Sequence, residues 1–284
     1  MKNKIVKLFL LFFGVIYLLM IIMGIVGKVP PNYYHVHQNN FQQYLPASKL
    51  HILGTSYFRK DIFTEFIFGA KSTFYSGILA LIPFLVMGIL LGVGSTYQQR
   101  PLSRFLDNFL ELLNSIPKLI GLLIFIGLFG NRVFFVMAIF GILSSPKLAE
   151  LIKGKILSLQ KEEFIDTLKA LGLPNVVIIL KHILWYNCKT IIISQMFFIY
   201  AAAVLIEASL SYVQLGFSQE SSSWGYMLYE AQSAPFRTIF TFPWNDNFHT
   251  QAFVTIMGLM IVTLSMFYLS LQFKQKDLLR RGIQ

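Results

Sequence analysis

The sequence predicts an all-α, polytopic membrane protein with six transmembrane helices and with both termini in the cytoplasm. The first observation is composition, because 55% of the 284 residues are hydrophobic and only 13% are charged, whereas soluble domains carry about 25% charged residues. The second is a series of long apolar stretches, and the third is the placement of basic residues around them. This composition excludes a disordered chain and argues against a soluble enzyme.

Six segments are candidate spans, since a helix that crosses a membrane needs about 20 mostly apolar residues. The first follows three lysines, as a signal peptide would, but its apolar run exceeds the roughly 7–15 residues of a signal core, so we expect a retained helix. Two candidates are weaker: Leu112–Gly130 is interrupted by Pro117 and Lys118, and Val133–Pro146 is short. The other four are Leu8–Gly27, Ser72–Thr96, Thr190–Ile206 and Thr250–Phe273.

The basic residues support this count and orient the chain. The net charge is +11, and sixteen of the 24 lysines and arginines fall in four clusters, whereas the alternate loops hold seven. Cytoplasmic loops carry the lysine and arginine excess, and six spans place all four clusters on one side. The chain is then divided into an N-terminal membrane helix (1–28), an external segment (29–71), a membrane core (72–273) with an internal loop (147–189) and an external loop (211–248), and a cytoplasmic tail (274–284).

Few residues of the chain are candidates for chemistry. Cys188 is the only cysteine, so we expect a buried apolar side chain rather than a disulfide or a metal cluster. His35, His37 and His51 lack nearby ligands at metal-site spacing and are interpreted as surface side chains. Lys71 and the serine after it resemble the end of a phosphate-binding loop, but the required glycines are absent. The basic clusters adjoin membrane segments, so the expected contact is lipid and no nucleic acid.

The internal loop contains an amphipathic helix, Glu162 to Leu171. Four apolar residues share one face of it, and Gly172 stands where a left-handed C-terminal cap would be. Pro174 suits the first turn of a second helix, which continues to Leu184. The apolar face either lies on the bilayer surface or docks into a soluble partner. Its residues are Phe164, Ile165, Leu168 and Leu171.

The external side offers a carboxylate and a cluster of aromatic residues. Glu207 lies near the end of the fifth predicted span, where an acidic group either lines a pathway, takes part in a structural hydrogen bond or sits at the interface. The external loop is rich in tyrosine and tryptophan, which suits either an interfacial aromatic belt or a lip facing a substrate. Within the second span, Gly88 and Gly92 predict close packing against another helix.

Four stretches, taken in order and spacing, resemble the permease subunits of binding-protein-dependent ATP-binding cassette importers, and most of all the second permease of the dipeptide, oligopeptide and nickel group. The resemblance covers roughly residues 50 to 273. The stretches are His51–Asp61, similar to H-x-L-G-T-D-x-x-G-R-D; Gly69–Ser72, similar to G-A-R-x-S; Glu163–Gly172, similar to the E-A-A loop; and Glu207–Tyr212 with Ser223–Leu228, similar to E-A-S-L-S-F and S-W-G-N-M-L.

The chain also departs from these motifs. Ser56, Arg59 and Lys60 stand in place of Asp, Gly and Arg in the first motif, and Trp185 stands where a proline is usual. In the E-A-A loop the glycine is kept, but the Glu-Ala-Ala itself is replaced by Asp166-Thr167-Leu168. The two bulkier side chains predict a groove of different shape on the partner that receives the loop.

The resemblance implies a type I importer fold, and it favours docking for the amphipathic loop. That loop would couple to a cytoplasmic ATPase through Glu163, Phe164, Asp166, Leu168, Ala170, Leu171 and Gly172. The external and translocation side would use Glu207, Ser211, Trp224 and Gly225. The partners implied are a second, homologous permease, ATP-binding cassette ATPase subunits and an extracellular solute-binding protein.

The same resemblance implies a transporter subunit of the bacterial plasma membrane that is not an enzyme and binds no cofactor directly, because ATP and magnesium are used by the partner ATPases. The cargo stays open between oligopeptides, nickel and metal chelates. The alternatives from other classes are an ATP-independent secondary transporter or channel, which predicts several buried ionisable groups in the spans, and a membrane scaffold without transport.

Overall fold

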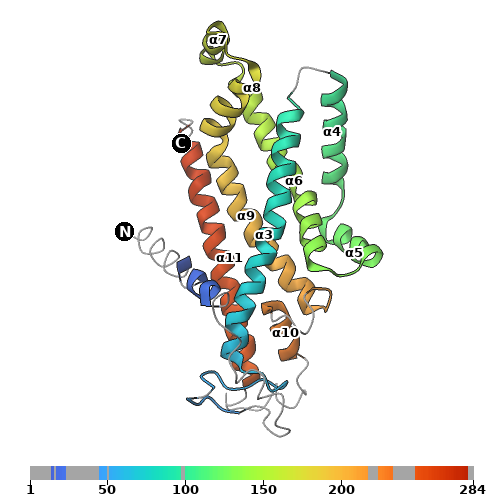
Figure 1. Ribbon diagram of the computed structural model, residues 1–284, viewed down its shortest axis with the longest axis vertical. Helices are drawn as coiled ribbons and strands as arrows, with labels where there is room; N and C mark the ends of the chain where they lie inside the picture. Colours follow the sequence, from blue (N-terminus) through green and yellow to red (C-terminus); the bar gives the residue numbers. More distant parts are fainter. Residues whose placement is uncertain are drawn as a thin grey trace. The chain divides into compact units, whose positions relative to one another are not determined.

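The structure is a computed structural model that describes residues 14–15, 17–23, 45–49, 51–96, 100–216, 223–232 and 247–280. Within these residues every named element is helical, and the β structure consists of one isolated bridge between Thr55 and Asp61 (Figure 1). The all-α prediction is confirmed for this part of the chain.

Four helical stretches among the described residues are long and apolar enough to cross a membrane, or five if one bent pair counts as a span. They are α3 (Ile62–Gly94), α6 (Val133–Leu159), the stretch Asn175–Tyr212, and Thr250–Lys276 within α11 (Asn247–Arg280). These match the second, fourth, fifth and sixth predicted spans. The first predicted span lies mostly outside the described residues, although its described residues 14–15 and 17–23 are helical. The count of six therefore stays a prediction.

The third predicted span is broken, as its proline indicated. Helix α4 (Arg100–Ser115) and helix α5 (Lys118–Phe129) meet at an angle of 88°. Pro117 precedes α5 with an extended backbone, φ −60° and ψ 118°, and a proline also pushes the residue before it out of the helical region. Together these two residues account for the break.

The helices that flank the internal loop are longer than predicted. Helix α6 continues through Pro146 to Leu159 instead of ending at that proline. The short helix α7 spans Glu163–Ala170. Beyond it, three helices are continuous with one another: α8 (Asn175–Val177), the π-helix η1 (Ile178–Cys188) and α9 (Lys189–Tyr212). Apolar length alone missed these extensions because they carry the lysines of the internal loop.

The chain divides into two compact units. Unit 1 consists of Met1–Gly77, Asn131–Val133 and Ala201–Ser265; unit 2 consists of Ile78–Gly130, Phe134–Tyr200 and Met266–Gln284. Helices α3, α9 and α11 contribute residues to both units. Unit 1 also contains α10 (Trp224–Gln232), and unit 2 contains α4, α5, α7, α8, η1 and α6 from its second residue onward.

The close packing predicted for the glycines of the second span is present in unit 2. A Cβ added at Gly88 would lie 2.8 Å from the Leu148 side chain, and one at Gly92 would lie 2.9 Å from the Ala149 carbonyl oxygen. Both contacts are with α6. Small residues allow helix backbones to approach this closely, so the Gly-x-x-x-Gly step has a structural role.

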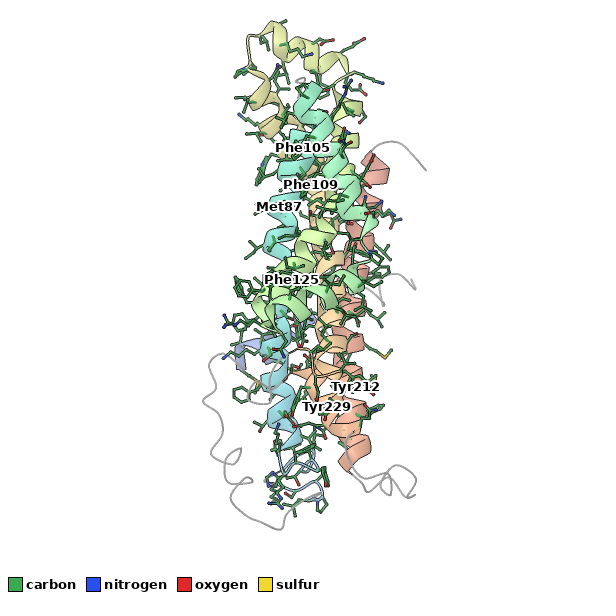
Figure 2. All side chains as sticks on the ribbon, turned by 90° about the vertical axis from the view of Figure 1, so that its right-hand side faces the viewer. Met87, Phe105, Phe109, Phe125, Tyr212 and Tyr229 are labelled. Carbon is green, nitrogen blue, oxygen red and sulfur yellow. The ribbon has the colours of Figure 1, made fainter. Side chains whose placement is uncertain are left out.

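Amphipathic α4 also packs into unit 2. Its Leu110 and Leu113 are buried in a cluster with Leu91, Leu143 and Ala149. Met87 and Phe109 pack against the same cluster and are labelled in Figure 2. The polar side of α4 faces α6 through a 2.6 Å hydrogen bond from Lys153 Nζ to Asp107 Oδ1.

Candidate functional site

Trp224, the first residue of α10, lies at the centre of unit 1. Its side chain is fully buried, and its ring stacks on Phe66 with 5.1 Å between centroids and contacts Tyr17 at 5.8 Å. The indole N–H donates to the Phe66 carbonyl oxygen at 2.8 Å. This burial does not fit the interfacial aromatic belt, one of the two interpretations of the loop's aromatic residues; Trp224 instead anchors α10 to α3.

Glycines make room for this anchor. A Cβ at Gly69 would lie 2.7 Å from Cδ1 of Trp224, and one at Gly258 would lie 2.6 Å from the Phe66 ring. A Cβ at Gly225 would collide with the backbone of Ala208 on α9. The glycines of two predicted motifs, Gly69 and Gly225, thus serve the close approach of α3, α9 and α10.

Glu207 and Ser211 form a buried polar contact beside this core. Glu207 is 1% exposed and Ser211 is fully buried. The Ser211 hydroxyl donates to Glu207 Oε1 at 2.6 Å, and the Ser223 hydroxyl also bonds to this carboxylate. Because Ser223 directly precedes α10, the structure brings the four predicted external residues, Glu207, Ser211, Trp224 and Gly225, into one region of unit 1. Glu207 has the hydrogen-bonding role that was one of its predicted alternatives.

A second buried polar group in unit 1 was missed by the sequence analysis. Lys60 Nζ donates to Glu230 Oε1 at 2.6 Å and to Glu65 Oε1 at 3.2 Å, and it lies 5.2 Å from the centre of the Tyr226 ring. The apolar run that was assigned to the second span begins only at Ser72, whereas α3 begins at residue 62, so Glu65 was placed in the external segment. Nothing in the local sequence around Lys60 and Glu65 indicates that their side chains lie together with Glu230.

His51 is also paired, contrary to its interpretation as a surface side chain. Its Nδ1 lies 2.9 Å from Asp61 Oδ2, and the two side chains are 12% and 6% exposed. Asp61 Oδ1 accepts a hydrogen bond from the Thr64 backbone N–H at 2.8 Å, which caps the N-terminus of α3. His35 and His37 lie outside the described residues. Within the described part of the chain, no three His, Cys, Asp or Glu residues group as metal ligands.

In unit 2, the loop between α6 and α8 presents helix α7 at the end of the unit where α6 ends (Figure 1). Ile165 is buried, whereas Phe164 is 41% exposed and Leu171 is 73% exposed. The predicted apolar face is therefore divided: Ile165 attaches α7 to its own unit, and the other residues are available to a partner. Of the predicted coupling residues, Leu168 is half-buried, while Glu163, Asp166 and Ala170 are exposed.

A complete C-terminal cap fixes where α7 ends. Gly172 has φ +80°, as predicted. The Leu173 N–H donates to the Leu168 carbonyl oxygen at 3.2 Å, and the Gly172 N–H donates to the Lys169 carbonyl oxygen at 2.9 Å. This pair of bonds is the Schellman motif. The glycine kept from the E-A-A loop is thus explained by backbone conformation.

Comparison with known proteins assigns this chain to a protein family. Residues 84–277 match the model of the family described as binding-protein-dependent transport system inner membrane component. The dipeptide transport system permease protein DppC of Alkalihalophilus pseudofirmus is 29% identical over 194 residues, which are 67% of this chain and 64% of that protein. DppC of Bacillus subtilis is 26% identical over 80% of this chain and 69% of that protein.

A third relative is also a peptide permease by name. The oligopeptide transport system permease protein OppC of Haemophilus influenzae is 28% identical over 178 residues, which are 63% of this chain. The matched region spans less than two thirds of the length of two of these three relatives, 64% and 57%. The family match itself covers more than half of the chain and includes α4 to α10.

Proposed function

Because this chain belongs to the family of binding-protein-dependent transport system inner membrane components, we propose that it is a permease subunit of an ATP-binding cassette importer. It is a multi-pass protein of the bacterial inner membrane, since the family match coincides with four to five apolar, membrane-capable helices. In the proposed complex it pairs with a homologous permease, and separate cytoplasmic subunits bind and hydrolyse ATP with magnesium.

The observation that carries the proposal is α7. Its Phe164 and Leu171 expose apolar surface at the end of a loop, while Ile165 and the cap at Gly172 hold the helix in a defined position. An exposed apolar surface rimmed by polar residues marks an interaction site. A rigid helix of this kind suits docking in a groove of an ATPase, where movement of the ATPase would be passed on to the membrane helices.

Unit 1 supports a role in the external part of the predicted topology. Trp224 bonds to Phe66 of α3, and Gly225 lies against the backbone of α9; together these contacts fix α10 between α3 and α9. In the proposed topology this end faces outward, where a solute-binding protein delivers cargo. The predicted external residues then act by positioning α10, since their side chains are buried.

Peptides are the proposed cargo. The three relatives described above are dipeptide or oligopeptide permeases by name, which favours peptides over nickel or metal chelates. Selection of the cargo would rest largely with the separate binding protein.

Two other functions are compatible with the sequence alone. A secondary transporter or channel predicts ionisable groups along a transport path, and the buried carboxylates of unit 1 belong instead to contacts that hold α10. A scaffold without transport predicts nothing about the internal loop, so it leaves the exposed residues of α7 unexplained. The family match and α7 together favour the importer.

The proposal is tested by affinity purification of the full-length chain from its native membrane. We expect a second permease and ATPase subunits to copurify, and we expect the Phe164→Ala/Leu171→Ala double variant to lose ATPase while it retains the second permease. Leu157→Ala is the matched control, because Leu157 is similarly exposed, at 42%, but lies on α6. A chain that transports peptides alone, or a double variant that retains ATPase in full, would contradict the proposal.

A further inference from the structure

A buried group of charges beside the first turn of α3 has more acidic than basic members. This group, here called the Lys60 cluster, consists of Lys60, Glu65 and Glu230, whose side chains are 8%, 0% and 2% exposed. Both glutamates contact the same ammonium group through Oε1, at 3.2 Å and 2.6 Å. One positive charge therefore faces two carboxyl groups, and with all three ionised the cluster would hold one uncompensated negative charge.

The neighbouring groups contribute no further positive charge among the described residues. The Tyr226 ring on α10 offers a neutral π face to the Lys60 ammonium. Asp61, next in sequence, already accepts from the backbone of α3 and contacts His51. From α11, the neutral hydroxyl of Thr255 donates to Met227 Sδ of α10 at 4.0 Å.

The second oxygen of each glutamate makes the excess of negative charge in the Lys60 cluster more costly. Oε2 of Glu65 and Oε2 of Glu230 are buried and have no hydrogen-bond partner among the described residues. The two carboxyl groups are neighbours, because each places its Oε1 within 3.2 Å of the same ammonium nitrogen. Ionised carboxylates accept hydrogen bonds and cannot donate them, so a bond between the two groups requires a proton. Burying an unpaired charge is also costly, and such a group neutralises instead.

We propose that the Lys60 cluster is a proton-binding site in which one proton is shared between the carboxyl groups of Glu65 and Glu230. The proton comes from water and forms an O–H bond with one carboxyl group, which then donates to the other. Both unpaired oxygens gain a partner in this way, and the cluster becomes neutral with Lys60 positive and one glutamate negative. Two carboxyl groups that share one proton are a known arrangement where like charges lie close together.

The proton would control how firmly α10 is attached to α3. Glu65 belongs to α3 and Glu230 belongs to α10, so the shared proton forms a bond between the two helices. Without it, repulsion between two carboxylates opposes the attraction of each to Lys60. This inference concerns unit 1 alone and does not depend on the cargo or on an ATPase.

Infrared difference spectroscopy of the full-length chain in lipid nanodiscs at neutral pH tests the proposal. The spectrum of the wild type should contain a carbonyl band of a protonated carboxyl group that is missing in Glu65→Gln and equally missing in Glu230→Gln. The double variant should lose no more intensity than either single variant, because only one proton is shared. Absence of any loss, or a loss that doubles in the double variant, would overturn the proposal.

Thermal unfolding as a function of pH gives a second, independent measurement. The folded wild type holds one proton that the unfolded chain releases, so its unfolding equilibrium should shift about tenfold per pH unit towards unfolding as pH rises through neutrality. Glu65→Gln should be at least as stable at neutral pH and should lack this slope. Glu150→Gln is the control, because Glu150 is exposed on α6 and its loss should leave the slope unchanged. A slope that persists in both Glu65→Gln and Glu230→Gln would refute the shared proton.

Discussion

At the scale of single residues, this structure separates groups whose chemistry is visible in the sequence from groups whose chemistry depends on a distant neighbour. Gly172 and Cys188 were predicted from local pattern and composition, and each is found as expected, with φ +80° and full burial. Lys60 was noticed only as a departure from a motif. Its partner Glu230 is 170 residues away, and no local pattern reports a contact over that separation.

Arg59 has a backbone conformation that is unfavourable for a residue with a Cβ atom. Its φ is +63°, in a region that costs a residue with a Cβ roughly 1–2 kcal/mol, and the motif that this stretch resembles has glycine here. We expect Arg59→Gly to raise the free energy of unfolding by about 0.5–1 kcal/mol, since glycine removes the strain but loses more backbone entropy. The measurement is chemical or thermal unfolding of the purified chain in detergent.

Arg59→Ala is the control for that substitution, because alanine keeps the Cβ and the strain while removing the guanidinium group. It should not stabilise the chain. If alanine stabilises as much as glycine does, the gain comes from loss of the charge and the backbone argument is incorrect.

At the scale of elements, α7 shows how a short helix is held in place by the residues around it. An eight-residue helix is marginal in isolation, and here its charged first turn, the buried Ile165 and the Schellman bonds after Ala170 hold it. The sequence correctly predicted this helix and its end. It placed four apolar residues on one face that would meet the bilayer or a partner; in the structure Ile165 is buried within the chain, whereas Phe164 and Leu171 are exposed.

Replacement of Gly172 should disturb α7 without unfolding the membrane helices. In Gly172→Val a β-branched residue would have to adopt positive φ, which is a backbone conformation such residues avoid. We expect membrane insertion to persist, ATPase copurification to fall about tenfold or more, and uptake of labelled peptide to fall with it. A strain of about 1.4 kcal/mol is enough for a tenfold change.

Gly154→Val is the matched control, because Gly154 lies within α6, has ordinary helical φ, and has open space where a Cβ would stand. It costs only the weak helix propensity of valine, and ATPase association should stay normal. Equal loss in both variants would show that Gly172 has no special role.

At the scale of the whole molecule, the distribution of charge predicts an orientation that remains to be measured. Membrane-impermeant thiol labelling in whole cells tests it, in a Cys188→Ala background so that each variant has one thiol. Ile52→Cys should label from outside, because Ile52 is 59% exposed before α3. Asn3→Cys and Lys276→Cys should label only after the membrane is permeabilised. Labelling of these two termini from opposite sides would refute an even number of spans.

The sequence by itself determined the class of this protein, most of its span positions and the internal helix with its cap. These features follow from apolar length, helical period and the conformational freedom of glycine, all of which act within about 20 residues. The resemblance of four ordered motifs also identified the family.

Only the tertiary structure decided which side chains meet. It placed Trp224 in a core with Phe66 and Tyr17, brought α10 against the backbone of α9 at Gly225, and assembled the Lys60 cluster from α10 and the beginning of α3. A carboxylate in a sequence carries the same charge wherever it stands. Whether it is solvated, paired or sharing a proton depends on burial and on neighbours brought from distant parts of the chain.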